Sequence, residues 1–239
     1  MTGQGVFVAG TDTDVGKTVV AAAVLALLRG GGTDAVPMKA VQTGCGFRDG
    51  ERVSPDLDFC LRMAELHVEA GEYAAMAPYL FEPPCSPHLA AAKAGREISL
   101  ARIAGSYKEL LENREFVVVE GSGGLLVPIA GEETMLDLAR LLALPVILAA
   151  RPGLGTLNHT LLSLRELGRA GLAVLGVVFC ETLGAPWGEI EEDNWKTIEQ
   201  MGRTKVLGRI PHMAGLADGG MAPDDFRRIS ERGLSLHRL

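Results

Sequence analysis

The chain has 239 residues, of which 47% are hydrophobic and 22% are charged, and this composition is typical of a folded globular protein rather than a disordered one. Its formal net charge of −7 argues against a general surface for nucleic acid or anionic membrane, so we expect neither as a partner. The apolar run at 19–28 is too short to cross a bilayer.

Apolar runs typical of strands alternate along the chain with patterns typical of helices. We predict strands at 5–9, 35–38, 116–119, 146–149, 173–179 and 205–207. We predict helices at 17–29, 57–66, 100–112, 135–142, 157–170 and 189–201. Several of the strand segments are continuously apolar, as expected where a parallel sheet is covered on both faces. The alternation predicts an α/β fold with a doubly wound, mostly parallel sheet flanked by helices.

No repeat, low-complexity tract or linker divides the sequence, so we expect a single domain over residues 1–239. The longest loop-like segment, 78–87, lies within that domain, and the sequence leaves open the role of the tail at 212–239. The N-terminus carries no basic region of the signal-peptide kind. The cysteines form no CxxC pair and have no histidine at metal spacing, which favours free thiols and a cytoplasmic protein. These cysteines are Cys45, Cys60, Cys85 and Cys180.

The stretch GTDTDVGKT, which follows the first predicted strand, ends like a phosphate-binding loop. Five residues separate Gly10 from Gly16, whereas the strict pattern has four, and Thr11 therefore stands where the first glycine is expected. In such a loop, backbone N–H groups and the helix N-terminus bind phosphate, Lys17 contacts the outer phosphates, and the Thr18 hydroxyl binds Mg²⁺. The alternative is an ordinary turn between strand and helix in which Lys17 is merely solvated.

Two further charged residues come at the ends of predicted strands. Lys39 follows the strand at 35–38, where open α/β sheets place their ligand crevice, although an edge lysine that reaches solvent is the alternative. Glu120 ends the run FVVVE, and a buried carboxylate there needs a charged partner such as a metal ion at the phosphate site. A capping or turn glutamate is the alternative for Glu120. Asp56 and Asp58 each offer another acidic ligand, and residue chemistry does not separate them.

A second helix start, at 153–159, follows the strand at 146–149 and offers another N-terminus able to bind an anion. An ordinary helix start with an incidental histidine is the alternative. Taken together, the residues predict a Mg-nucleotide enzyme with a second lysine and a second anion site near the phosphates. Residue chemistry alone does not name the substrate.

Taken in order, these stretches resemble the dethiobiotin synthetase family, which belongs to the P-loop NTPase superfamily. The similarity runs from about residue 6 to residue 211, and the family shares the five-residue spacing of the loop with threonine first. Several motifs in one order are far more specific than Gly-Lys-Thr alone. The motifs are GTDTDVGKT at 10–18, KAVQTG at 39–44, SPH at 86–88, VEGSGGLLVP at 119–128, GTLNHT at 155–160 and GRIP at 208–211.

The resemblance implies a reaction that closes a cyclic urea on 7,8-diaminopelargonate, using CO₂ and ATP, in biotin biosynthesis. One amine captures CO₂ as a carbamate, and a carbamate oxygen then takes the γ-phosphoryl group to give a carbamic–phosphoric anhydride. The second amine closes the ring and expels phosphate. The products are dethiobiotin, ADP and phosphate, so the implied enzyme is a ligase.

The resemblance also implies a role for individual residues. The catalytic residues would be Thr13, Lys17 and Lys39. The Mg²⁺ ligands would be Thr18, Asp56 and Glu120, with Asp56 preferred to Asp58 because the sequence around it aligns better with the family. The nucleotide would be bound by Asp14, Val15, Gly16, Lys17, Thr18, Val19, Glu120, Cys180, Ile210 and Pro211. The diamine and its carbamate would be bound by Thr13, Lys39, Thr43, Gly123, Gly155, Thr156, Leu157 and Asn158. Residues 155–158 would come from a second subunit, which implies a homodimer with shared active sites.

Cys180 departs from the family pattern, in which ATP-specific members carry an asparagine whose amide reads the adenine edge. A thiol is only a weak donor and acceptor and cannot replace that amide. We therefore expect other nucleoside triphosphates to support the reaction alongside ATP.

Three alternatives are weaker. A ParA/MinD-like nucleotide-switch ATPase shares the fold class, but its loop begins with an additional lysine where this chain has Gly10 and Thr11. A cobyrinate amidase needs an appended amidotransferase domain, for which we expect no room in this chain. A non-catalytic nucleotide-binding module leaves Lys39 and the segment at 155–158 unexplained.

Overall fold

The computed structural model describes residues 4–182, 184–216 and 219–236. Its centre is a six-stranded sheet in the order β12-β11-β10-β1-β7-β2, in which every neighbouring pair is parallel. These strands are β1 (Gly5–Gly10), β2 (Ala35–Lys39), β7 (Phe116–Gly124), β10 (Val146–Ala150), β11 (Val174–Cys180) and β12 (Val206–Ile210). This sheet confirms the predicted α/β fold class.

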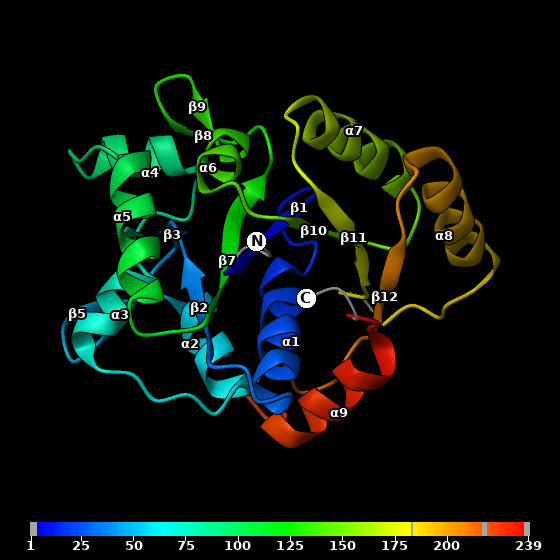
Figure 1. Ribbon diagram of the computed structural model, residues 1–239, viewed down its shortest axis with the longest axis horizontal. Coiled ribbons are helices and arrows are strands. Elements are labelled where there is room, and N and C mark those ends of the chain that lie inside the picture. The colour runs from blue at the N-terminus through cyan, green and yellow to red at the C-terminus, as the bar shows by residue number, and fades with distance from the viewer. Residues whose placement is uncertain (1–3, 183, 217–218, 237–239) are drawn as a thin grey trace.

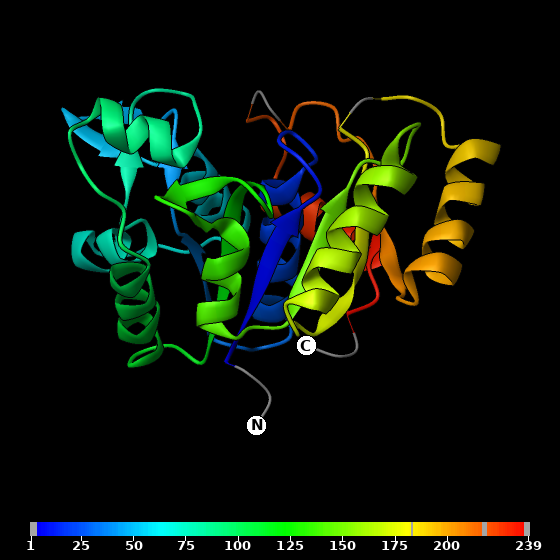
Figure 2. The same cartoon turned by 90° about the horizontal axis from the view of Figure 1, so that it is seen from above.

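Helices cover both faces of the sheet. They are α1 (Lys17–Gly30), α2 (Pro55–Met63), α3 (Ala70–Met76), α4 (Pro87–Lys93), α5 (Leu100–Leu111), α6 (Met135–Leu142), α7 (Thr156–Arg169), α8 (Glu189–Gly202) and α9 (Pro223–Gly233). Figure 1 shows α1 and α9 below the row of strands and α6 and α7 above it. Viewed from above, α5 and α8 lie at opposite ends of the molecule (Figure 2).

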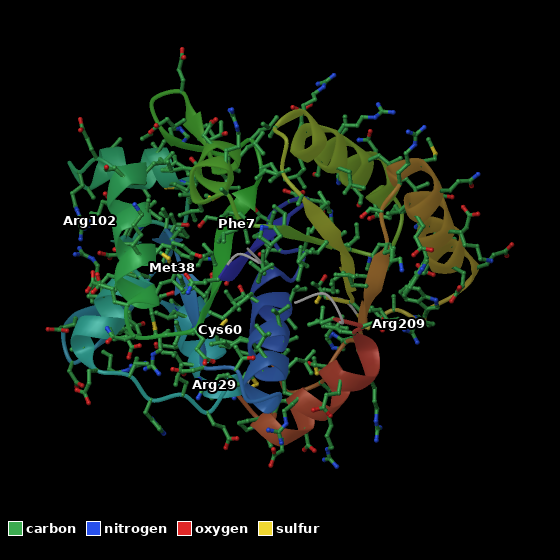
Figure 3. All side chains as sticks on the ribbon, in the orientation of Figure 1. Phe7, Arg29, Met38, Cys60, Arg102 and Arg209 are labelled. Carbon is green, nitrogen blue, oxygen red and sulfur yellow. The ribbon has the colours of Figure 1, made fainter. Side chains whose placement is uncertain are left out.

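The two faces of the sheet bury two separate hydrophobic clusters. Along β1, Phe7 and Ala9 belong to the cluster that contacts α5, α6 and α7, while Val6 and Val8 belong to the cluster around α1. This alternation follows from the two-residue period of a strand. Figure 3 marks Phe7 in the first cluster and Cys60, which belongs to the second, beside α1. Burial on both faces explains why β1 and β10 are apolar throughout.

Three two-stranded ribbons accompany the main sheet. They are β3 (Gln42–Thr43) with β6 (Leu80–Phe81), β4 (Gly46–Arg48) with β5 (Glu51–Val53), and β8 (Pro128–Ala130) with β9 (Glu133–Thr134). The first pair is parallel, and the other two are antiparallel. The β3–β6 pair fixes the chain just after β2. This segment follows the carboxyl end of β2, as the phosphate loop follows the carboxyl end of β1.

The structure confirms the six predicted strands and six predicted helices but moves several boundaries. The helix predicted at 57–66 is α2, which begins at Pro55 and ends at Met63. The strand predicted at 205–207 is β12, at Val206–Ile210. The predicted loop at 78–87 was wrong in part, because it contains β6 and the first residue of α4. Helices α3, α4 and α9 were not predicted from the sequence.

The described part of the C-terminal tail packs against the rest of the fold. Phe226 of α9 is fully buried and meets Phe59 edge-to-face, with ring centroids 6.0 Å apart. Leu234 then forms a bridge with Gly208 of β12, and the Ser235 N–H donates to the Leu207 carbonyl at 2.8 Å. Gly208 has a φ of 141°, and a side chain there would collide with the Gly233 carbonyl, so only glycine allows this close approach.

Within the described ranges, no helix is long and apolar enough to cross a membrane. The four cysteines are free thiols, as predicted.

Candidate active site

The loop between β1 and α1 has the geometry of a phosphate-binding loop. Gly16 caps α1 with a φ of 85°, and Lys17 is the first residue of that helix, with 7% of its surface exposed. The Lys17 ammonium donates to the Asp12 carbonyl at 2.6 Å. A Cβ on Gly10 would lie 2.7 Å from Lys17 Cδ and 2.8 Å from Nζ, so this glycine makes room for the lysine side chain. A glycine is therefore needed at position 10 because the Lys17 side chain passes close to it, and not because the strict loop pattern has a glycine there.

Burial lowers the pKa of Lys17 to about 8, although the carboxylate of Glu120 opposes the effect. A nearby positive charge on Lys39 also lowers the pKa. The Lys17 ammonium therefore lies in a site where an added negative charge, such as a phosphate, would be strongly favoured.

A buried ionic cluster lies beside the loop. The Lys39 ammonium contacts Glu120 Oε1 at 2.6 Å and Asp56 Oδ2 at 2.7 Å. The Thr18 hydroxyl donates to the same Glu120 oxygen at 2.8 Å. Lys39 and Glu120 are 5% and 3% exposed, whereas the Asp56 side chain is 31% exposed. Burial alone would lower the pKa of Lys39, but the two carboxylates outweigh it and raise the pKa, so Lys39 is an ammonium at neutral pH.

Strand register explains how residues so distant in sequence meet. In the parallel pair of β2 and β7, Lys39 lies directly opposite Glu120. Neighbouring parallel strands have their carboxyl ends on the same side of the sheet, and the phosphate loop begins at the carboxyl end of β1 on that side. Asp56 reaches this cluster from the first turn of α2.

The structure separates the two aspartates that residue chemistry left open. Asp58 forms an ion pair with Arg48 and accepts a hydrogen bond from the Tyr73 hydroxyl at 2.8 Å. Asp56 instead shares Lys39 with Glu120. The oxygens of Thr18, Asp56 and Glu120 thus gather at one place, and Asp58 belongs to a neighbouring network.

Two cavities meet at the start of α1. The first, about 950 Å³, brings together the phosphate loop and the ends of β2 and β7, and its lining includes Thr13, Asp14, Gly16, Lys17, Lys39, Thr43, Glu120 and Gly123. The second, about 1210 Å³, runs from α1 along the ends of β11 and β12, and its lining includes Cys180, Glu181, Thr182, Pro211 and His212. Both cavities border Thr18, Val19, Asp56 and Thr182. A nucleotide could therefore place its phosphates in the first cavity and its base in the second.

Three predicted nucleotide contacts have side chains that are buried. Val15 and Ile210 are fully buried in the cluster around α1 and appear in the lining of neither cavity, so any nucleotide contact would come from their backbone. Cys180 is 3% exposed and lies against Gly16, where an added side chain would collide with its sulfur. Burial raises the pKa of the Cys180 thiol to about 12, so the group is neutral.

The segment predicted to bind the substrate from a second subunit lies outside the Lys39 cavity of its own chain. Gly155 caps α7 with a φ of 90°, and the Thr156 hydroxyl, which is buried, lies 3.1 Å from that of Thr160. Leu157 is half-buried, and Asn158 is exposed. None of residues 155–158 lines the cavity that contains Lys39.

Several buried polar residues at the site were not predicted from the sequence. Gln42, Ser54 and Ser122 are 6%, 0% and 8% exposed, and Gln42 and Ser122 line the Lys39 cavity. The pair Ser54-Pro55 carried a usable signal, because serine is a favoured helix cap and proline is favoured at the first helical position.

The fold and the loop define a P-loop α/β protein. A family model described as an AAA domain matches residues 4–218. The septum site-determining protein MinD of Pyrococcus horikoshii, solved with Mg-ADP, superposes with a TM-score of 0.59 over 97% of this chain and 96% of that one. The two sequences are 17% identical, so this likeness concerns the fold alone.

Sequence comparison is more specific. The ATP-dependent dethiobiotin synthetase of Anoxybacillus flavithermus is 38% identical over 215 residues, which cover 90% of this chain and 94% of the relative. The enzyme of the same name from Anaeromyxobacter dehalogenans strain 2CP-1 is 48% identical over 179 residues, or 75% of this chain and 77% of the relative. The chain belongs to the ATP-dependent dethiobiotin synthetase family.

Proposed function

We propose that this chain is an ATP-dependent dethiobiotin synthetase, which closes a cyclic urea on 7,8-diaminopelargonate with CO₂. The observation that carries the proposal is the single cavity in which the phosphate-loop lysine, Lys17, and the second lysine, Lys39, both lie. A nucleotide switch needs the first lysine, whereas a second buried cation is suited to an anionic substrate beside the phosphates. Family membership supplies the identity of that substrate.

The reaction places three demands on the residues of this cavity. The carbamate formed on the first amine is an anion, and Lys39 offers a cation to hold it. When a carbamate oxygen attacks the γ-phosphorus, the bond to the β,γ-bridging oxygen breaks and ADP leaves, and Lys17 stabilises the charge that moves with the phosphoryl group. The second amine then attacks the carbonyl carbon and expels phosphate, losing its proton to solvent. Thr13 and Thr43, which line the same cavity, would orient the diamine and the carbamate.

The oxygens of Thr18, Asp56 and Glu120 fit a magnesium ion. Magnesium prefers oxygen ligands and is usually bound by one or two carboxylates together with substrate phosphates. When bound there, the ion would neutralise phosphate charge.

We further propose that the enzyme is a homodimer in which residues 155–158 of one subunit complete the substrate site of the other. Two observations support this. The segment lies outside its own Lys39 cavity, and the neighbouring Leu154 is 97% exposed, so its apolar side chain is accessible for packing against a partner subunit. A helix N-terminus there would attract the distal carboxylate of diaminopelargonate.

We also propose that the chain is one domain, because its six-stranded sheet joins β1, near the start of the chain, to β12, near its end, and Leu234 of the tail bridges to the edge strand β12.

The test is to incubate the protein with diaminopelargonate, bicarbonate and MgATP. We expect a product heavier than the diamine by one carbonyl group less two hydrogens, and phosphate release that depends on both diamine and CO₂. Phosphate release that continues unchanged without the diamine would contradict the synthetase and favour a switch ATPase.

A further inference from the structure

Ser54, a fully buried serine, connects the helix that carries Asp56 to the substrate cavity. Its hydroxyl caps α2 by accepting from the Leu57 N–H at 3.1 Å. The same hydroxyl donates to Gln42 Oε1 at 2.5 Å. Because this hydroxyl is fully buried, its proton needs an acceptor, and the acceptor is the side chain of a residue that lines the substrate cavity.

Gln42 carries the connection to the substrate side. It is 6% exposed, lines the Lys39 cavity, and donates from its Nε2 to the Thr43 carbonyl at 2.7 Å. Both ends of its amide are therefore engaged by the protein. Gln42 thus supports the cavity wall, and Thr43 is the neighbour predicted to meet the substrate.

A second hydrogen bond fixes the same helix start through the backbone of Ser54. The Ser54 N–H donates to the Tyr73 hydroxyl at 2.9 Å, and that hydroxyl donates to Asp58 at 2.8 Å. The start of α2 is thereby held through both the side chain and the backbone of Ser54. Asp56 lies only two residues after Ser54, so the position of its carboxylate depends directly on where this turn begins.

We infer that Ser54 and Gln42 are positioning residues, which hold Asp56 in place beside Lys39 and Glu120 and join it to Thr43. This inference rests on the proposed function, since it assigns Asp56 to the metal site of the synthetase. Metal and substrate would then share one rigid support, because both Asp56 and Thr43 are fixed through the bond between Ser54 and Gln42.

The test measures metal affinity directly. Mn²⁺ binding to the protein–ADP complex is followed by electron paramagnetic resonance in Ser54→Ala, Gln42→Leu and the double variant. We expect each single change to weaken Mn²⁺ binding about tenfold and to leave ADP affinity without metal within about twofold. The double variant should lose little more than either single one, because both changes remove the same bond.

Ser99→Ala is the matched control. Ser99 caps α5 by accepting from the Arg102 N–H at 3.3 Å, and it is absent from the lining of both cavities. Ser99→Ala should lower the melting temperature, as loss of a cap does, and leave Mn²⁺ affinity unchanged. Gln42→Leu keeps the α2 cap, so it tests the inference even where Ser54→Ala does not fold.

Unchanged Mn²⁺ affinity in folded Ser54→Ala or Gln42→Leu, or an equal loss in Ser99→Ala, would overturn the inference. Because the measurement uses Mn²⁺ and ADP rather than turnover, a wild-type protein that makes no dethiobiotin would contradict the proposed function without deciding this result.

Discussion

The Lys39 ammonium lies 2.6 Å from Glu120 Oε1, and both side chains are almost fully buried. Register places them directly opposite each other on β2 and β7. With Asp56 as a second partner, Lys39 is one cation shared by two carboxylates, and a second positive charge, on Lys17, lies in the same cavity.

Lys17 and Lys39 should act at different points. We expect Lys17→Ala to lower turnover by ~10²-fold or more and to weaken nucleotide binding, because it removes an electrostatic contact to the transferring group. Lys39→Ala should lower turnover as severely but leave nucleotide binding less affected, since its proposed partner is the carbamate. Calorimetric titration with a non-hydrolysable ATP analogue distinguishes the two. An equal loss of nucleotide affinity in both variants would disprove the separate roles.

Nucleotide affinity should fall as pH rises above about 8. The pKa of Lys17 is lowered to about 8 by burial, so the protein without nucleotide loses this charge as the pH passes that value. Phosphate favours the charged form, and binding must therefore take up a proton above pH 8, which weakens affinity by up to tenfold for each pH unit. Titration of the non-hydrolysable analogue between pH 7 and pH 10 gives the slope.

Lys17→Arg is the control for this pH dependence, because arginine keeps its charge throughout the range. If the variant retains measurable affinity, its slope above pH 8 should be flat. The same slope in wild type and Lys17→Arg would show that another group titrates.

Two inactive variants should restore activity to each other if the active sites are shared. Asn158→Ala should weaken diamine affinity without altering the nucleotide site, and Lys17→Ala should damage the nucleotide site alone. After subunit exchange, a mixed dimer would contain one site with both residues intact. We expect partial recovery of dethiobiotin formation in the mixture. Absence of recovery from heterodimers whose exchange has been demonstrated would count against sites that borrow residues 155–158.

Base selectivity should be relaxed. Cys180 replaces the asparagine expected to read adenine, and its neutral thiol lies against Gly16 with 3% of its surface exposed. A bidentate amide contact to a base contributes roughly 1–3 kcal/mol of discrimination in nucleic-acid readout, and its loss corresponds to roughly 5- to 150-fold. We expect CTP or GTP to support turnover within about tenfold of ATP. The measurement is kcat/KM for ATP, CTP, GTP and UTP at saturating diamine and bicarbonate, and an ATP preference above ~100-fold over every other nucleotide would refute the prediction.

The sequence predicted those parts of the fold whose pattern is local. The central strands are continuously apolar because both of their faces are buried, and α6 has its own signal in Thr134 and Asp137, which cap each other. The predicted start of α2 was two residues late. Apolar periodicity begins at Leu57, whereas the helix begins at Pro55, after its cap at Ser54. Most of α9 is polar, and its burial depends largely on Phe226 meeting Phe59, a contact that periodicity does not reveal.

At the site, the residue types could be predicted, but their partners could not. A lysine and a glutamate at strand ends indicate a ligand crevice, yet the pairing of Lys39 with Glu120 depends on the order of β2 and β7 in the sheet. Contact between Cys180 and Gly16 likewise requires β11 to end beneath the phosphate loop. Both relationships come from topology, which single-sequence patterns do not specify.

The contact between Leu234 and Gly208 also restricts how copies of this protein can associate. An edge strand normally exposes N–H and C=O groups that can recruit a strand from another molecule. At β12, the Leu207 carbonyl is taken by Ser235, and the adjacent Gly208 is bridged to Leu234. The chain thus covers part of this edge of its own sheet, which leaves less of β12 open to pairing with a strand of another molecule.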